Sequence, residues 1–123
     1  MKLYLSHATS FDYKKELYEP LRKSKLNKMY EIIMPHENST DLFNSKDFLK
    51  SDSKNIMIAE ISYPSIGLGI ELGWANAFGN KIICIYKKDA KLSSSVKVVT
   101  KNIIAYENSK DLIDKLSETL KYI

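Results

Sequence analysis

Residues 55–75 read NIMIAEISYPSIGLGIELGWA, and the interpretation of the whole chain starts from them. The segment 55–61 is almost entirely apolar, which is typical of a strand buried on both faces of a parallel sheet. The segment 67–78 repeats apolar side chains at helical spacing. A buried strand, a short turn with glycines and a helix together form one building unit of an α/β protein.

The same alternation continues on both sides of this unit. The expected strands are residues 2–6, 30–34, 55–61, 81–86 and 102–106. The expected helices are residues 12–23, 45–51 and 67–78, and a last amphipathic helix from Ser109. Because strands alternate with helices, we expect one flavodoxin-like or Rossmann-like α/β domain over residues 1–123. Its five strands should be mainly parallel, with helices on both faces of the sheet.

Three local signals refine these boundaries. Asp12 is expected to cap the first helix, and Pro20 is expected to kink it or end it early. Gly79 follows the helix over 67–78 and is expected to close it. Ser109 is expected to cap the last helix.

Composition excludes several classes of protein. With 123 residues, 44% of them hydrophobic, the chain is long enough for one core and too apolar for a disordered protein. No apolar run is long enough to span a bilayer, and the first residues are too short an apolar run for a signal peptide, so a cytoplasmic protein is expected. The single cysteine, Cys84, lies in an expected strand, which excludes an internal disulfide and favours a buried, inert side chain.

The charge of the chain favours a small ligand over a nucleic-acid polymer. The net charge is +4, but the lysines are dispersed and Arg22 is the only arginine. Base readout in nucleic-acid complexes depends strongly on arginine. A mild positive potential is equally suited to a small phosphorylated ligand.

The turn after the strand over 55–61 is the most informative candidate site. Parallel sheets bind ligands at the carboxyl ends of their strands, and the free N–H groups of a helix start attract anions. Glu71 lies in the first turns of this helix, where the dipole favours an ionised carboxylate of the kind a nucleophile requires. Acidic residues in first turns also simply stabilise helices, so the residues alone leave both roles open. Glu60, near the end of a buried strand, must meet either a backbone donor or a ligand.

Residues 55–75 resemble the signature of the nucleoside 2-deoxyribosyltransferase family, most closely its 2′-deoxynucleoside 5′-phosphate N-hydrolase branch. That branch carries the pattern Ala-Glu-Val-x-x-Pro-Ser-x-Gly-x-Gly-x-Glu-x-Gly-x-Ala, which residues 59–75 follow closely. The resemblance covers about a sixth of the chain. The loop over residues 6–10 departs from the branch, because it contains none of the glycines that wrap the phosphate there.

The resemblance implies a role for seven residues. Glu71 corresponds to the nucleophile that attacks the anomeric carbon, and Asp47 corresponds to the second catalytic carboxylate, which assists the departing base. The implied substrate-binding residues are Tyr4, Ser65, Gly67, Gly69 and Ser95. Among these, Ser65 corresponds to a serine that contacts the 5′-phosphate. One of Ser93, Ser94 and Ser95 corresponds to a serine that a dimer partner inserts at the phosphate, and ungapped counting selects Ser95.

The function implied by the resemblance is cleavage of the N-glycosidic bond of 2′-deoxynucleoside 5′-monophosphates. The products would be a free base and deoxyribose 5-phosphate. No metal or other cofactor is expected. The resemblance also implies a homodimer with a shared active site. Two rival functions remain: a transferase that exchanges bases between nucleosides, and a nucleotide-binding sensor domain without turnover. Cleavage of NAD or another ribosyl ligand would use the same kind of carboxylate.

Overall fold

The computed structural model describes residues 1–123 and contains one five-stranded sheet in the order β2-β1-β3-β4-β5. The strands are β1 (Lys2–His7), β2 (Glu31–Ile33), β3 (Ile56–Glu60), β4 (Ile82–Lys87) and β5 (Ile103–Tyr106). Every neighbouring pair is parallel. The helical segments are η1 (Lys14–Tyr18), α1 (Glu19–Arg22), α2 (Leu26–Met29), α3 (Ser45–Ser51), α4 (Ile66–Ala77), α5 (Val96–Val99) and α6 (Ser109–Lys121). The expected α/β fold is confirmed.

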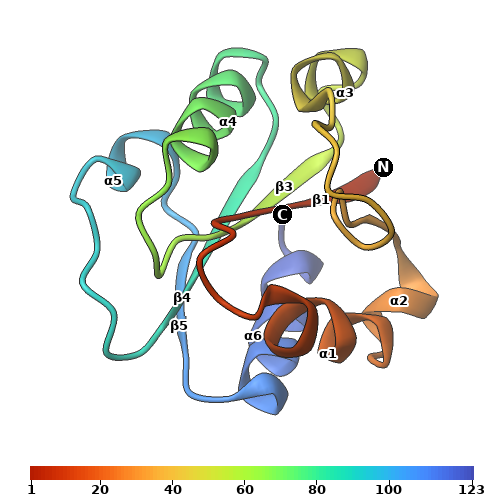
Figure 1. Cartoon of the computed structure of the whole chain (residues 1–123), viewed down its shortest axis with the longest axis vertical. Helices are drawn as coiled ribbons and strands as arrows, with labels where there is room; N and C mark the ends of the chain where they lie inside the picture. Colours follow the sequence, from red (N-terminus) through yellow and green to blue (C-terminus); the bar gives the residue numbers. More distant parts are fainter.

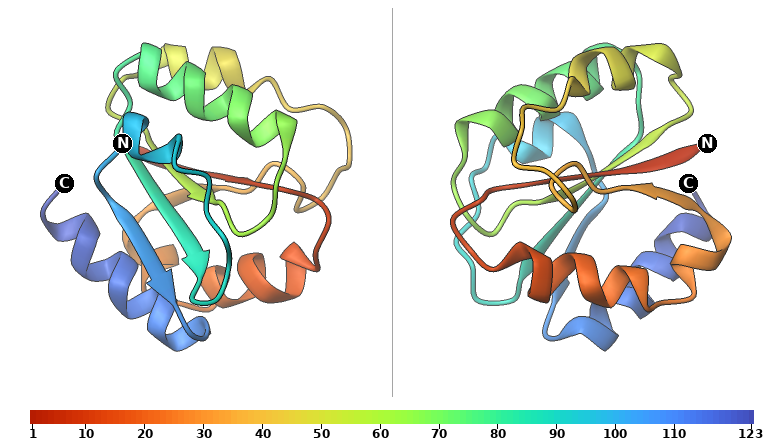
Figure 2. Two further views of the ribbon diagram at one scale, coloured as in Figure 1. Left: turned by 90° about the vertical axis from the view of Figure 1, so that its left-hand side faces the viewer. Right: turned by 45° about the vertical axis from the view of Figure 1, so that its right-hand side comes forward.

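Helices cover both faces of the sheet, as Figure 1 and Figure 2 show: α3, α4 and α5 lie on one face, and η1, α1, α2 and α6 on the other. Alternate strand residues supply the two cores. Leu3 and Leu5 face the layer of α1 and α6, whereas Tyr4 faces the layer of α3 and α4. Cys84 is fully buried in the second core, where burial raises the pKa of its thiol to about 11. It therefore packs as an inert side chain, as expected.

The first helix is distorted where the sequence places Pro20. The N–H of Glu19 donates to the carbonyl of Lys14, five residues earlier, so η1 is a wide turn that runs directly into α1. Proline has no N–H to donate, and the distortion lies immediately before it. The expected irregularity at Pro20 therefore takes the form of this wide turn, and the Asp12 side chain accepts a hydrogen bond from the N–H of Lys15, as a cap would.

Two local expectations need correction. The cap of α6 is Asn108 and not Ser109, because the Asn108 side chain accepts a hydrogen bond from the Asp111 N–H at 2.9 Å. The short helices α2 and α5 were not expected, since four residues are too few to show a helical period. Gly79 closes α4 with a φ of +79°, a conformation that costs glycine little.

The strand order fixes where a ligand can bind. The chain passes from β1 to β2 on one side and then returns to β3 on the other side of β1. The loops after β1 and β3 therefore diverge, and such a switch point is where open parallel sheets form ligand clefts. No helix here has the length and apolar character needed to cross a lipid bilayer.

Candidate active site

A cavity of about 650 Å³ opens at this switch point. Its walls come from the end of β1, the loop between β2 and α3, the start of α3 and one side of α4. Predicted site residues that line it are Tyr4, Ser65, Gly67 and Glu71. A larger cavity of about 870 Å³ lies beyond β4 and β5 and contains none of the predicted site residues. The first cavity is therefore the candidate active-site cleft.

Both carboxylate oxygens of Glu71 are held by hydroxyl groups of β1. Tyr4 Oη donates to Glu71 Oε2 at 2.6 Å, and Ser6 Oγ donates to Glu71 Oε1 at 2.7 Å. Because side chains two apart in a strand share a face, residues 4 and 6 both point at α4. Burial and the neighbouring Glu71 charge raise the pKa of Tyr4 far above its ordinary value, so its hydroxyl remains a donor. The carboxylate is thus oriented by two fixed donors.

Ser6 is a site residue that the sequence reasoning missed. It is 1% exposed and contacts the carboxylate as closely as Tyr4 does. The available signal was its spacing: it stands two residues after Tyr4 in the same expected strand, and therefore on the same face.

Ser65 caps α4 and leaves its hydroxyl proton available. Its Oγ accepts from the Leu68 N–H at 3.3 Å, and the side chain lines the cleft. A hydroxyl that accepts through its oxygen can still donate its own proton to a ligand. The first N–H groups of the 12-residue helix α4, which starts directly after Ser65, have no acceptor within the helix.

The two glycines in the first turn of α4, Gly67 and Gly69, are not required by the chain's own packing. A Cβ at Gly67 would meet only Ser65 Oγ, at 3.9 Å, and a Cβ at Gly69 would meet nothing within 4 Å. Glycine inside a helix costs roughly 0.5–1 kcal/mol relative to alanine. Gly67 lines the cleft, whereas Gly69 lines a smaller cavity of about 350 Å³ on the other side of the α4 start.

Asp47 does not join Glu71 in the cleft. It is exposed on α3 and is not among the residues that line the cavity. Its Oδ2 accepts from Asn44 Nδ2 at 2.8 Å, while its own N–H donates to Asn44 Oδ1 at 3.1 Å. The catalytic role of Asp47 therefore stays a prediction, and it requires the side chain to leave Asn44.

Ser95 is also outside the cleft within a single chain. It is exposed immediately before α5 and lines the 350 Å³ cavity together with Ser93 and Ser65. Ser65 thus stands between the two cavities. A contribution of Ser95 from a second copy stays a prediction.

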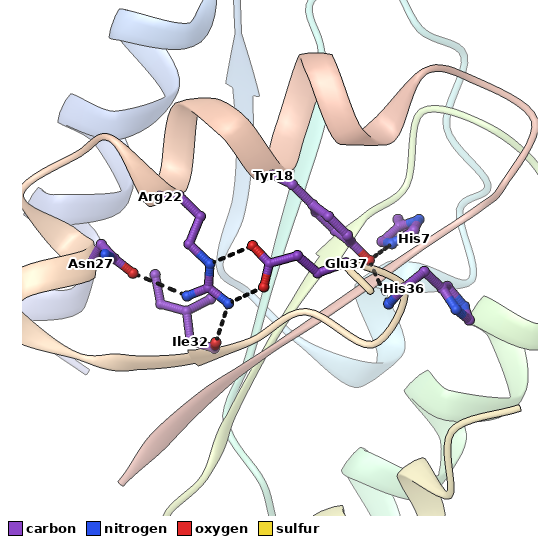
Figure 3. Close-up of polar contacts among 7 residues, drawn as sticks. All are labelled: His7, Tyr18, Arg22, Asn27, Ile32, His36 and Glu37. Atoms are coloured by element: carbon purple, nitrogen blue, oxygen red, sulfur yellow. Dashed lines mark hydrogen bonds and ion pairs between the residues drawn. The ribbon is translucent and has the colours of Figure 1, made fainter. Parts of the chain in front are cut away.

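His7 is held in one neutral form beside the cleft. Its Nδ1 lies 2.7 Å from the Ala8 carbonyl, which can only accept, so Nδ1 carries the proton. Its Nε2 lies 2.6 Å from Tyr18 Oη, which also accepts from the His36 N–H at 3.2 Å and so gives its own proton to Nε2. Figure 3 shows the contacts of the Tyr18 hydroxyl with His7 and with His36. Burial lowers the pKa of His7, in agreement with this pattern.

Glu60 has a structural role. Its carboxylate accepts from the Ser62 N–H at 2.5 Å and from the Tyr106 hydroxyl, and it does not line the cleft. The sequence left open whether Glu60 meets a backbone donor or a ligand, and the structure shows a backbone donor, the Ser62 N–H. No three His, Cys, Asp or Glu side chains gather to hold a metal ion.

Comparison with known proteins was made on sequence and on fold. No protein-family profile matches the chain. It is 30% identical over 60 residues to the 5-hydroxymethyl-dUMP N-hydrolase of Branchiostoma floridae, covering 47% of this chain and 57% of that protein. It is 29% identical over 87 residues to the protein of the same name from Esox lucius, covering 59% of this chain and 60% of that protein. The matches thus span less than two thirds of these relatives.

The fold comparison extends over almost the whole chain. The CMP N-glycosidase BcmB of Clostridium botulinum has a TM-score of 0.68 and 25% identity, covering 95% of this chain and 99% of that one. The predicted family resemblance is confirmed. The chain is similar in sequence to the N-hydrolase branch of the nucleoside 2-deoxyribosyltransferase family, and it is similar in fold to a nucleotide N-glycosidase.

Proposed function

We propose that this protein is an enzyme that hydrolyses the N-glycosidic bond of a 2′-deoxynucleoside 5′-monophosphate, with Glu71 as the nucleophile. The observation that carries the proposal is the Glu71 carboxylate, held by the buried hydroxyls of Tyr4 and Ser6 at the wall of a 650 Å³ cleft. The names of its relatives, two 5-hydroxymethyl-dUMP N-hydrolases and a CMP N-glycosidase, support the same reaction class.

The chemistry proceeds in two displacements. A Glu71 oxygen attacks the anomeric carbon, the carbon–nitrogen bond breaks, and its electron pair leaves with the base. Water then attacks the same carbon and breaks the ester, which releases deoxyribose 5-phosphate and restores the carboxylate. Both steps pass through a state with oxocarbenium character, which the nearby negative charge stabilises. The departing base requires a proton, and Asp47 could supply it only after turning away from Asn44.

The phosphate is proposed to bind at the start of α4. Ser65 offers its hydroxyl proton, and the first-turn N–H groups add the positive end of the helix dipole. A ligand that comes close to the protein backbone at Gly67 would also explain why a glycine stands there, since the chain's own packing does not require one. These hydroxyl and N–H donors would replace the glycine-containing loop of the branch.

The experiment is a panel assay for released base. Wild-type protein and the Glu71→Gln variant are incubated with deoxynucleoside monophosphates, 5-hydroxymethyl-dUMP and CMP, and free base is measured by chromatography. The proposal expects release by the wild type and at least a 1,000-fold slower release by the variant. The control is Glu118→Gln, an exposed carboxylate on α6 paired with Lys121, which should leave the rate unchanged. Exchange into an added second base would instead identify a transferase.

A second candidate function is nucleotide binding without turnover. The position of Asp47, exposed and bound to Asn44, favours it, because the second carboxylate is not in place for catalysis. Trp74 is the only tryptophan and lines the cleft, so its fluorescence reports binding. A fluorescence change with nucleotides, in the absence of any released base, would support this candidate.

We further propose that the protein acts as a homodimer in which a second copy supplies Ser95. Two side chains of α4, Ile66 and Ile70, are 86% and 48% exposed, and Val98 of α5 is 83% exposed. Ile66 directly follows Ser65 in the chain and Val98 stands between Val96 and Val99, which line the cavity that Ser65 and Ser95 share, whereas Ile70 lines the cleft itself. A second copy placed there would cover them and close the phosphate end of the cleft.

A further inference from the structure

The turn between β3 and α4 contributes residues to two cavities. Ser65, at the start of α4, lines the cleft, whereas Ser62 and Tyr63 line the 870 Å³ cavity beyond β4 and β5. Pro64 joins the two parts of the turn. Because proline fixes its own φ and restricts the residue before it, the position of Tyr63 limits where Ser65 can stand. Contacts made on the far side of the turn can therefore affect the cleft.

The first residue of the turn is tied to the sheet by Glu60, the only buried carboxylate of the chain. Glu60 Oε1 accepts from the Ser62 N–H at 2.5 Å, and Oε2 accepts from the Tyr106 hydroxyl of β5. Burying a carboxylate is costly unless its oxygens are hydrogen-bonded, and these two contacts occupy one oxygen each. Glu60 thus connects the start of the turn to a strand two positions away in the sheet.

Lys87, the last residue of β4, contacts the next part of the turn twice. Its backbone N–H donates to Ser62 Oγ at 2.7 Å, and its Nζ donates to Tyr63 Oη at 2.7 Å. The Tyr63 ring stacks on Phe11 with ring centres 4.6 Å apart. Lys87 Nζ lies 5.0 Å from the centre of the Tyr63 ring and 5.4 Å from that of Phe11, within the range of cation–π attraction. One lysine therefore holds two consecutive residues of the turn.

A neighbouring lysine lines the same cavity without holding the turn. Lys87 Nζ also donates to Glu16 Oε1 of η1 at 2.5 Å, which fixes the ammonium group between η1 and the turn. Lys88 Nζ instead donates to Glu107 Oε1 at 2.9 Å and makes no hydrogen bond to the turn. The two lysines carry the same charge at adjacent positions, so a comparison of them separates the effect of contact from the effect of charge.

We propose that Lys87 and Glu60 are positioning residues for the phosphate site. They hold the turn from the side opposite the cleft, and so place the Ser65 hydroxyl and the first N–H groups of α4 before a ligand arrives. The inference rests on the proposed function, because it takes the phosphate position from there. Neither side chain lines the cleft, so both act through the turn and not on the substrate.

The main test compares a ligand that has a phosphate with one that lacks it. Binding of dUMP and of deoxyuridine to the Glu71→Gln variant is followed by Trp74 fluorescence. Adding Lys87→Met, which keeps an unbranched side chain but loses every Nζ contact, should raise the dissociation constant of dUMP about 2- to 10-fold and leave that of deoxyuridine unchanged. Lys88→Met is the matched control and should change neither constant.

Three results of this comparison would overturn the role of Lys87. An unchanged dissociation constant for dUMP would show that the lysine does not act on the phosphate site. Equal rises for dUMP and deoxyuridine would show a general disturbance of the cleft. An equal rise for dUMP in Lys88→Met would show that charge alone, and not contact with the turn, is responsible.

A double variant tests whether the effect passes through Tyr63. Tyr63→Phe removes only the hydroxyl that Lys87 Nζ contacts and keeps the ring beside Phe11. It should raise the dissociation constant of dUMP by no more than Lys87→Met does, and the double variant should be no worse than Lys87→Met alone. Additive losses would contradict a shared route. A loss of thermal stability in Lys87→Met without a loss of dUMP affinity would show a merely structural lysine.

Glu60 is tested by a conservative and a disruptive substitution. Glu60→Gln should keep the affinity for dUMP, because its amide oxygen can accept from the Ser62 N–H while its NH₂ group donates to the Tyr106 hydroxyl. Glu60→Leu loses both contacts and should raise the dissociation constant of dUMP alone. Tyr106→Phe, which removes one of the two contacts, replaces Glu60→Leu if that variant does not fold. Wild-type affinity for dUMP in the disruptive variant would refute the role of Glu60.

The outcomes separate this inference from the proposed function. A loss of dUMP affinity in Lys87→Met, without base release by wild-type protein, would support the positioning role and refute the hydrolase. Base release by wild-type protein, with unchanged dUMP affinity in Lys87→Met, would refute the positioning role alone. If no nucleotide of the panel changes Trp74 fluorescence or releases base, both are refuted.

Discussion

Glu71 is the residue on which the proposed chemistry depends, and its two hydroxyl partners differ in how visible they are in sequence. Tyr4 belongs to the family resemblance, whereas Ser6 does not. Both meet the carboxylate at hydrogen-bond distance, 2.6 and 2.7 Å. Hydroxyl–carboxylate contacts from a buried strand would orient the proposed nucleophile before substrate arrives, which is a condition for effective catalysis.

Replacing Ser6 should therefore impair the reaction more than binding. Ser6→Ala removes a hydrogen bond to a charged group, worth about 1.5–3 kcal/mol, so kcat should fall about 10- to 100-fold with little change in KM. Steady-state kinetics on the best substrate of the panel measures both constants. Ser117→Ala is the matched control, because the Ser117 hydroxyl is buried on α6 without a partner. A rise in KM at constant kcat would contradict the orienting role.

Ser65 should act on the other end of the substrate. Ser65→Ala removes a proposed phosphate donor, so KM should rise roughly 10-fold for a nucleoside monophosphate and stay unchanged for the matching nucleoside. The same substitution also removes the cap of α4, which costs about 1 kcal/mol of stability. Ser65→Asp keeps a capping side chain but introduces repulsion toward phosphate, and it should be worse than alanine for the monophosphate alone.

At the scale of elements, the end of β1 is joined to η1 by a buried hydrogen-bonded pair. His7 stacks on Tyr13 with ring centres 4.4 Å apart and accepts from Tyr18 through Nε2. This arrangement uses the neutral ring, because protonation would turn Nε2 into a donor and leave the Tyr18 hydroxyl proton without its acceptor. The junction between strand and helix is therefore sensitive to acid.

The stability of the fold should fall as the solution becomes acidic. Because the pKa of His7 is lowered in the folded protein, the unfolded chain binds a proton first as the pH drops below about 6.5. Stability is fully present above that pH and decreases below it, before the carboxylates titrate. Thermal unfolding between pH 7.5 and 5 measures the trend. His7→Asn should be less stable at pH 7.5 but show a flatter pH dependence, and an unchanged slope would count against this account.

The elements also show which sequence signals sufficed. The expected strands and the helices α3 and α4 agree with the structure to within two residues, because short apolar runs bounded by turn residues and apolar repeats at helical spacing are local signals. The short helices α2 and α5 were not predicted, and the cap of α6 is Asn108 where Ser109 was predicted. Neighbouring Asn and Ser residues are both good caps, so only the tertiary position of the chain selects between them.

At the scale of the whole molecule, the exposed apolar side chains of α4 and α5 predict self-association. Ile66→Lys should convert a dimer into a monomer, because it places a charge in the middle of the proposed contact. Light scattering coupled to size-exclusion chromatography measures the mass. Tyr122→Lys, at an 82% exposed position beyond α6, serves as the control and should leave the mass unchanged.

The activity of the same variants tests whether the active site is shared. If a second copy supplies Ser95, Ile66→Lys should lose monophosphate hydrolysis together with the dimer, and Ser95→Ala should lose affinity for the monophosphate while remaining dimeric. A monomeric wild-type protein with full activity would refute the shared site.

The sequence by itself determined the class of fold and which segments form strands. It also placed Glu71 in the first turns of the helix that follows a buried strand. Apolar periodicity and a contiguous turn motif are local properties, and both are readable without coordinates. Only the tertiary structure decided which side chains meet: Ser6 with Glu71, Arg22 with Glu37, and Asp47 with Asn44 instead of the cleft. The physical reason is that these contacts join segments or select rotamers, and neither is fixed by residue type and spacing.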